Sequence, residues 1–191
     1  MRLVCGLGNP GALFANTRHN AGFMVLDWLA EKKQVRWNKP KEGIVTARLA
    51  HDVLLAKPDV FMNLSGGPIA ALARYHKVAP ATHLLLVVDC VALEVGRIKL
   101  ARGGGGHAGQ QGTRSVMEQL GTPDFARLRV GIGPPRSRGT ALAEHVLSSF
   151  GAQERETLRC TMGLAADAIQ VWLQQGIDVA MNEFNNSSKL R

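Results

Sequence analysis

Residues 84–89, which read LLLVVD, decide the fold of this chain. Five apolar residues in a row, with no alternating polar position, are typical of a strand buried on both faces at the centre of a sheet. The run stops at Asp89, so a carboxylate stands at the C-terminal end of the predicted central strand. Open α/β sheets bind their ligands beyond that end. Asp89 is therefore the first candidate site residue.

Strand-like and helix-like segments alternate outward from this run in both directions. Expected strands cover residues 3–7, 44–49, 53–56 and 125–132, and expected helices cover residues 21–33, 67–75, 112–120 and 154–174. This alternation predicts an α/β fold with a mixed, twisted sheet flanked by helices. No repeat or linker divides the chain, so we expect residues 1–191 to form a single compact domain. The tail from about residue 185 is expected to be loose.

Composition excludes several classes of protein. Hydrophobic residues make up 46% of the chain and charged residues 20%, which is too apolar for a disordered protein. No apolar run approaches the ~18 residues of a membrane span, so no contact with a membrane is expected. The start reads as strand and turn and leaves no room for a signal peptide. Cys5, Cys90 and Cys160 are too few and too widely spaced for a disulfide framework or a metal site. These features favour a cytoplasmic protein.

The chain is basic, with 23 Lys and Arg residues against 15 Asp and Glu residues and a net charge of +8. Residues 97–138 contain eight of the cations and only two of the anions, together with four consecutive glycines at 103–106. Cations beside flexible loops can follow a phosphate backbone, so a nucleic acid is the expected partner. The alternative is a solvated basic face without a partner.

The first predicted strand runs into the turn GLGNPG at residues 6–11. The turn begins like a dinucleotide-binding fingerprint but lacks its later glycine, and Pro10 removes an N–H that a phosphate cradle would use. Nucleotide binding is therefore the weakest hypothesis. The glycines and Pro10 instead indicate a rigid turn that fixes the side-chain amide of Asn9.

The sequence TRHN at residues 17–20 places His19 just before the first predicted helix. A histidine there is often a cap or a surface residue. However, Asp89 can plausibly reach it, and a carboxylate that holds an imidazole is the arrangement of a general base. Cys90 follows Asp89, but neighbouring side chains of a strand point to opposite faces, so a cysteine nucleophile is not expected. Activation of water is the favoured chemistry.

The segment FMNLSG at residues 61–66 supplies a second amide. Asn63 or Ser65 could cap the helix that follows. Alternatively, Asn63 binds a substrate carbonyl or hydroxyl while Met62 contacts an apolar group. The two interpretations are compatible if Ser65 lies at the cap and Asn63 points into the cleft.

These motifs, together with RLRVGIG at residues 127–133, resemble those of the bacterial-type peptidyl-tRNA hydrolase family, in order over roughly residues 2–185. The resemblance implies a compact, monomeric α/β domain without metal or cofactor. It implies cleavage of the ester between a peptide and the terminal ribose of tRNA. It also implies roles for individual residues: His19 as base, Asp89 as its orienting partner, Asn9 and Asn63 as substrate-positioning amides, Met62, Phe14 and Gln111 in the cleft, and Arg129 with Lys99 or Arg102 as the clamp on a tRNA phosphate.

The chain also departs from the family pattern. Ala92 replaces the second aspartate of H-D-E-L-D, Gln111 replaces the asparagine of G-H-N-G, and Phe14 lacks a phenolic hydroxyl. The departures motivate an alternative, a non-catalytic RNA-binding protein on the same scaffold, similar to relatives that act in splicing. A pure binding protein would not need the combination of histidine, aspartate and two asparagines, so hydrolysis is favoured.

Overall fold

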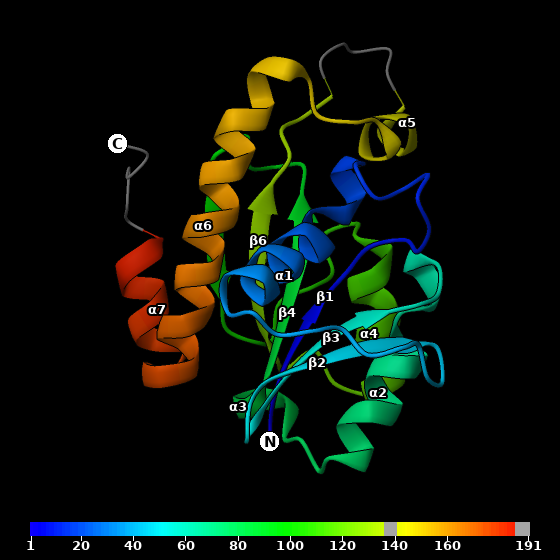
Figure 1. Cartoon of the computed structure of the whole chain (residues 1–191), viewed down its shortest axis with the longest axis vertical. Coiled ribbons are helices and arrows are strands. Elements are labelled where there is room, and N and C mark those ends of the chain that lie inside the picture. The colour runs from blue at the N-terminus through cyan, green and yellow to red at the C-terminus, as the bar shows by residue number, and fades with distance from the viewer. Residues whose placement is uncertain (136–140, 186–191) are drawn as a thin grey trace.

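A computed structural model describes residues 1–135 and 141–185. A six-stranded sheet with the strand order β2-β3-β1-β4-β6-β5 forms its centre (Figure 1). The strands are β1 (Arg2–Gly6), β2 (Ile44–Ala50), β3 (Val53–Pro58), β4 (Leu84–Cys90), β5 (Ile98–Ala101) and β6 (Ala126–Gly131). The four inner strands pair in parallel, whereas β2 and β5 pair antiparallel at the two edges. The predicted mixed sheet is confirmed.

Helices cover both faces of this sheet (Figure 1). They are α1 (Ala21–Lys32), α2 (Gly66–Tyr75), α3 (Pro80–His83), α4 (Gln111–Leu120), α5 (Leu142–Leu147), α6 (Ala152–Gln175) and α7 (Ile177–Phe184). One apolar core joins α1 and α6 to the face of β4 that carries Leu85 and Val87. The other joins α2 and α4 to the opposite face, which carries Leu84 and Leu86. The central strand is therefore buried on both sides, as its sequence predicts.

Four elements escaped the sequence prediction: β5, α3, α5 and α7. Strand β5 has only four residues and sits at an edge, with the exposed Lys99 in its middle, so it carries little apolar signal. Helix α7 follows α6 after a break at Gly176 and ends against β5. The side-chain amide of Asn185 there exchanges two hydrogen bonds, of 2.8 and 2.9 Å, with the backbone of Leu100. Asn185 is thus held in place, contrary to the expected loose tail, and the rest of that tail lies outside the described residues.

Within residues 1–135 and 141–185, no helix is long and apolar enough to cross a membrane.

Two adjacent glycines at the start of α2 provide a test of how closely α2 and α4 approach each other. A Cβ added at Gly66 would overlap the backbone carbonyl of Ser115 in α4, whereas one at Gly67 would meet nothing within 4 Å. We expect Gly66→Ala to lower the free energy of unfolding by about 3 kcal/mol, the upper end of the usual effect of overpacking. Gly67→Ala should leave it unchanged or raise it by about 0.5–1 kcal/mol, because alanine favours a helix. Denaturant unfolding of the two variants measures both effects, and equal stabilities would contradict the close approach.

Candidate active site

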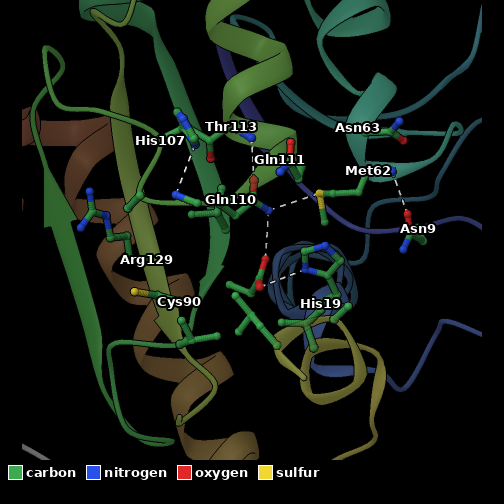
Figure 2. A pocket seen from close by; sticks show the side chains of 18 of the residues that line it. Asn9, His19, Met62, Asn63, Cys90, His107, Gln110, Gln111, Thr113 and Arg129 are labelled. Carbon is green, nitrogen blue, oxygen red and sulfur yellow. Dashed lines mark hydrogen bonds and ion pairs between the residues drawn. The ribbon is translucent and has the colours of Figure 1, made fainter. Parts of the chain in front are cut away.

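A cleft with a volume of about 720 Å³ opens at the C-terminal end of β4 (Figure 2). Eight of the ten predicted site residues line it: Asn9, Phe14, His19, Met62, Asn63, Asp89, Gln111 and Arg129. These residues come from segments far apart in the chain, including the turn after β1, the residues before α1 and α2, and the start of α4. Of the described residues, the other two candidates, Lys99 and Arg102, are not part of the cleft lining.

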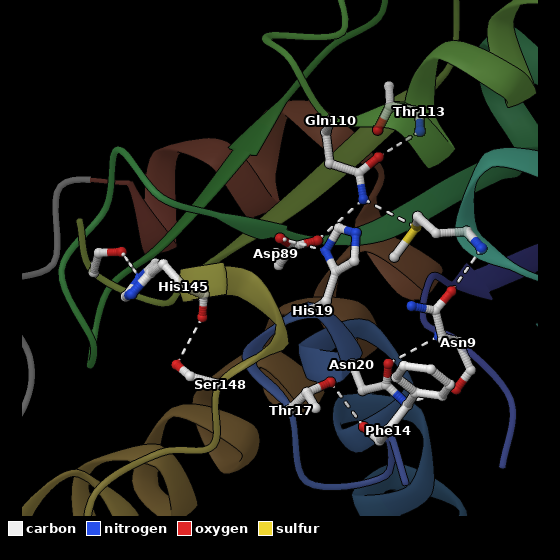
Figure 3. Close-up of polar contacts among 12 residues, drawn as sticks. Asn9, Phe14, Thr17, His19, Asn20, Asp89, Gln110, Thr113, His145 and Ser148 are labelled. Atoms are coloured by element: carbon white, nitrogen blue, oxygen red, sulfur yellow. Dashed lines mark hydrogen bonds and ion pairs between the residues drawn. The ribbon is translucent and has the colours of Figure 1, made fainter. Parts of the chain in front are cut away.

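His19 and Asp89 form a hydrogen-bonded pair in this cleft. Nδ1 of His19 lies 3.0 Å from Oδ2 of Asp89, and the two side chains are 14% and 4% exposed. Asp89 follows Leu85 and Val87 on the face of β4 that α1 covers, and His19 lies in the 3₁₀ turn η1 (Arg18–Asn20) that leads into α1. A carboxylate can only accept, so Nδ1 carries the proton and Nε2 is left with a free lone pair. Nε2 points into the cleft (Figure 3).

Arg18, the residue before His19, anchors the turn that carries His19. The Arg18 guanidinium is buried and donates to the carbonyl of Ile132 at 2.9 Å and to Glu154 in α6 at 2.7 Å. It also lies over the ring of Phe150, 4.7 Å from its centre. These contacts tie the turn to the residue that follows β6 and to α6, and so fix the backbone from which His19 projects. The role of Arg18 was missed because the partners lie more than a hundred residues away in the chain.

Asn9 is held by two partners at once. Its backbone N–H donates to Oδ1 of Asn20 at 2.8 Å, and its carbonyl accepts from Nδ2 of Asn20 at 2.9 Å. Its own Oδ1 accepts from the backbone N–H of Met62 at 2.7 Å. The remaining group of the Asn9 amide, Nδ2, lies on the His19 side of the side chain (Figure 3). The sequence predicts that glycines and Pro10 fix Asn9. In the structure the side-chain amide of Asn20 also holds the backbone of Asn9.

Gln110 lines the cleft but is not among the residues predicted from the sequence, which include its neighbour Gln111. It is the N-cap residue of α4, and its Oε1 accepts from the backbone N–H of Thr113 at 2.6 Å. Its Nε2 donates to Oδ1 of Asp89 at 3.0 Å and lies 3.2 Å from Sδ of Met62. Gln111 is the first residue of α4 and lines the cleft at an exposed position. An unusual capping residue was the available signal, because Ser, Thr, Asp and Asn are the preferred N-caps.

An apolar rim borders the cleft beside Met62. Phe14 and Phe61 form an edge-to-face pair with ring centres 6.2 Å apart, and Phe61 is 57% exposed. Asn63 lies next to them on the 3₁₀ turn η2 (Met62–Leu64) and is exposed at the cleft. Ser65 occupies the N-cap position of α2, as predicted, but its side chain makes no capping hydrogen bond. Among the described residues its buried hydroxyl has no hydrogen-bond partner.

A buried arginine, Arg127, holds the glycine loop at residues 103–106 by hydrogen bonds to its backbone carbonyls. Arg127 is 2% exposed, and its guanidinium donates to the carbonyls of Gly105, Gly106 and Pro123 at 2.7–3.0 Å. Burial lowers the pKa of Arg127, and the nearby cation of Arg129 lowers it further. Arg127 is therefore an internal clamp on the loop and not one of the surface cations that the charge count suggested.

The other cations of the basic stretch differ in how far they are free to bind a polyanion. Lys99 pairs with Arg129 across the β5–β6 ladder, so both side chains lie on the same face of the sheet. Arg102 instead forms an ion pair with Asp178 of α7, and Arg114 pairs with Glu118 within α4. Arg136 and Arg138, which the charge count included, lie outside the described residues. Of the three predicted phosphate contacts, Lys99 and Arg129 lie together and Arg102 is already paired.

Cys90 also lines the cleft, but its sulfur points away from His19 and lies on the Arg129 side (Figure 2). It does not form the thiol–imidazole pair that a cysteine nucleophile requires.

The α/β fold and its cleft together define a class of protein, a hydrolase with an imidazole base. The base is supported by a carboxylate, amide side chains line the same cleft, and two cations are paired on neighbouring strands of the sheet.

Comparisons with known proteins agree with this class. The family model for peptidyl-tRNA hydrolase matches residues 3–191. The peptidyl-tRNA hydrolase of Desulfitobacterium hafniense (strain Y51) is 42% identical over 187 residues, which are 97% of this chain and 100% of that protein. That of Mycolicibacterium vanbaalenii is 45% identical over 184 residues and covers 94% of each chain. The crystal structure of peptidyl-tRNA hydrolase from Acinetobacter baumannii matches with a TM-score of 0.88 at 33% identity, over 97% of this chain and 95% of that one. The chain belongs to the peptidyl-tRNA hydrolase family.

Proposed function

We propose that this protein hydrolyses the ester bond between the peptide and the tRNA in peptidyl-tRNA, which releases free tRNA for reuse in translation. The observation that carries the proposal is the His19–Asp89 pair, whose Nε2 faces a cleft bordered by the amides of Asn9 and Asn63. Relatives named peptidyl-tRNA hydrolase over the full length of the chain support the choice of substrate.

The first chemical step is the attack of water on the ester. Nε2 of His19 takes a proton from the water while its oxygen bonds to the carbonyl carbon of the peptide. Asp89 stabilises the imidazolium that results, because its carboxylate accepts from Nδ1. The carbonyl oxygen becomes an oxyanion, and N–H groups of Asn9 and Asn63, with Gln111 at the rim, stabilise it.

The second step restores the enzyme. The tetrahedral intermediate collapses, the bond to the terminal ribose oxygen breaks, and His19 returns its proton to that oxygen. The products are a peptide with a free carboxylic acid and a tRNA with a free ribose hydroxyl. Phe14 and Met62, which border the cleft, supply apolar contacts to the peptide side of the substrate.

The tRNA is proposed to be held by cations at the border of the catalytic cleft, where Arg129 is part of the lining and Lys99 is not. Lys99 and Arg129 lie side by side on the sheet and are proposed to bind a phosphate of the tRNA. Arg102 is the weaker alternative to Lys99, because its guanidinium already pairs with Asp178.

Salt dependence of tRNA binding tests this assignment. We expect Lys99→Ala and Arg129→Ala each to weaken binding and to lower the slope of log K against log salt by about 1, because each variant releases about one counterion fewer. Arg102→Ala should change the slope less. In all three variants the turnover at saturating peptidyl-tRNA should be largely unaffected. An unchanged slope for Arg129→Ala would rule out a phosphate contact at that position.

We also propose that the protein acts as a monomer in the cytoplasm and without a metal or cofactor, as the resemblance to the peptidyl-tRNA hydrolase family implies. Light scattering coupled to gel filtration measures the mass in solution, and a dimer would contradict the first point.

Release of tRNA from peptidyl-tRNA by the purified chain is the experiment that tests the proposed function. Activity would exclude the alternative, a non-catalytic RNA-binding protein. Binding of tRNA without release would support that alternative.

A further inference from the structure

A series of contacts links Asn20 to Asp89 and His19 through three further residues of the cleft lining, Asn9, Met62 and Gln110 (Figure 3). Asn20 holds Asn9, Asn9 accepts from the backbone of Met62, and the sulfur of Met62 contacts Gln110. Gln110 donates to Asp89, and Asp89 pairs with His19, the chain neighbour of Asn20. Gln110 is the member that connects this series of contacts to α4.

Gln110 satisfies the half of the Asp89 carboxylate that His19 does not reach. Oδ2 of Asp89 faces Nδ1 of His19 at 3.0 Å, and Oδ1 lies 3.0 Å from Nε2 of Gln110. The Asp89 side chain is only 4% exposed, so water has little access to it. A carboxylate held at both oxygens keeps a fixed plane, whereas one held at a single oxygen can turn about its last side-chain bond. The direction of the Asp89–His19 hydrogen bond therefore depends on the amide of Gln110.

The opposite end of the same amide is fixed by the backbone. Oε1 of Gln110 accepts from the N–H of Thr113 at 2.6 Å, which fixes which end of the amide is the acceptor and turns the amino group toward Asp89. A shorter capping residue such as serine would satisfy the helix equally well but could not reach Asp89. The length of the glutamine side chain is explained by the second contact and not by the cap.

We propose that Gln110 is a positioning residue for the general base: it orients the carboxylate of Asp89 and through it the imidazole of His19. The inference rests on the proposed function, because it assigns Gln110 to the same catalytic pair. It adds a further consequence, namely that the base is aligned only when the start of α4 is in place.

Two variants separate this role from capping. Gln110→Ser keeps a good N-cap but removes the contact with Asp89. Gln110→Glu keeps an acceptor for Thr113 but replaces the donated N–H with a second carboxylate at mildly alkaline pH. We expect both to lower kcat by about 10–100-fold, as found when partners that orient metal-bound imidazoles are removed. KM and the midpoint of unfolding should stay close to those of the unaltered protein, and Gln110→His, which restores an N–H donor and an acceptor, should recover turnover.

A second readout is independent of turnover. The Nδ1–H proton of His19, seen by proton NMR, should shift in Gln110→Ser and Gln110→Glu because its acceptor has turned. Gln119→Glu, which adds the same charge at an exposed position of α4, is the matched control and should leave both kcat and the resonance unchanged.

The outcomes are decisive in either direction. Unaltered kcat and an unmoved His19 resonance in both variants would overturn the proposal. A loss of turnover that follows a loss of folding stability, with no shift of the resonance, would assign Gln110 to the cap alone and overturn it as well. If the unaltered protein released no tRNA, the proposed function would fail, while the NMR shift would still report on the position of Asp89.

Discussion

His19→Ala is expected to lower kcat for tRNA release by about 10²–10⁴-fold, the usual contribution of a positioned general base. Nε2 of His19 is the proton acceptor for the attacking water, and alanine leaves no group at that place. Binding of tRNA should hardly change, because the cations proposed to hold it, Lys99 and Arg129, come from β5 and β6. The measurement is the release rate at saturating substrate together with the Kd for tRNA.

The control for this variant is His51→Ala. His51 is exposed in the turn between β2 and β3, outside the cleft lining, so its loss should leave kcat unchanged. Near-normal turnover of His19→Ala would remove His19 from the mechanism. A parallel loss of turnover and of tRNA binding would instead indicate that the variant disturbs the fold.

Asn9→Asp is expected to lower kcat by about 10²–10³-fold, the effect of removing one donor to an oxyanion. The substitution isolates the role of Nδ2, because it keeps the oxygen that accepts from the backbone N–H of Met62 at 2.7 Å and replaces only the NH₂ group. The backbone of Asn9 remains held by Asn20 in either case. The turn should therefore keep its shape while the developing negative charge meets a carboxylate in place of an N–H group.

Steady-state kinetics of Asn9→Asp, with unfolding as a check on the fold, measures this effect. Asn38→Asp, the same change at an exposed amide, should leave kcat unaltered. If Asn9→Asp raised KM while kcat stayed normal, Asn9 would bind the substrate without stabilising the transition state, which would contradict the assigned role.

Much of the fold could be predicted because its strongest signals are local. The apolar run of β4 lies at the centre of the sheet, and α1 and α6 follow the spacing of their apolar residues. Strand β5 could not be predicted, since its stability comes from pairing with β6 and from the contact of Asn185 with Leu100. An edge strand of four residues has no pattern of its own.

The site divides in the same way. His19, Asp89, Asn9 and Asn63 could be located because they follow strands or precede helices, where polar side chains of α/β proteins gather. Gln110 and Arg18 were not located, because their partners Asp89 and Ile132 are distant in the chain, and the only local signal was the unusual N-cap residue at Gln110. For Arg127 the sequence predicted a role that the structure does not support. The count of cations placed it on the surface, but it is buried and holds the carbonyls of the glycine loop.

The most direct test of the account is a single-turnover experiment with the full chain in excess over purified peptidyl-tRNA. Ester cleavage and complex formation are followed in the same samples. We expect the unaltered protein both to bind the substrate and to release free tRNA, whereas His19→Ala should form the complex with similar affinity and leave the ester intact. Binding of peptidyl-tRNA by the unaltered protein without release of tRNA would contradict it.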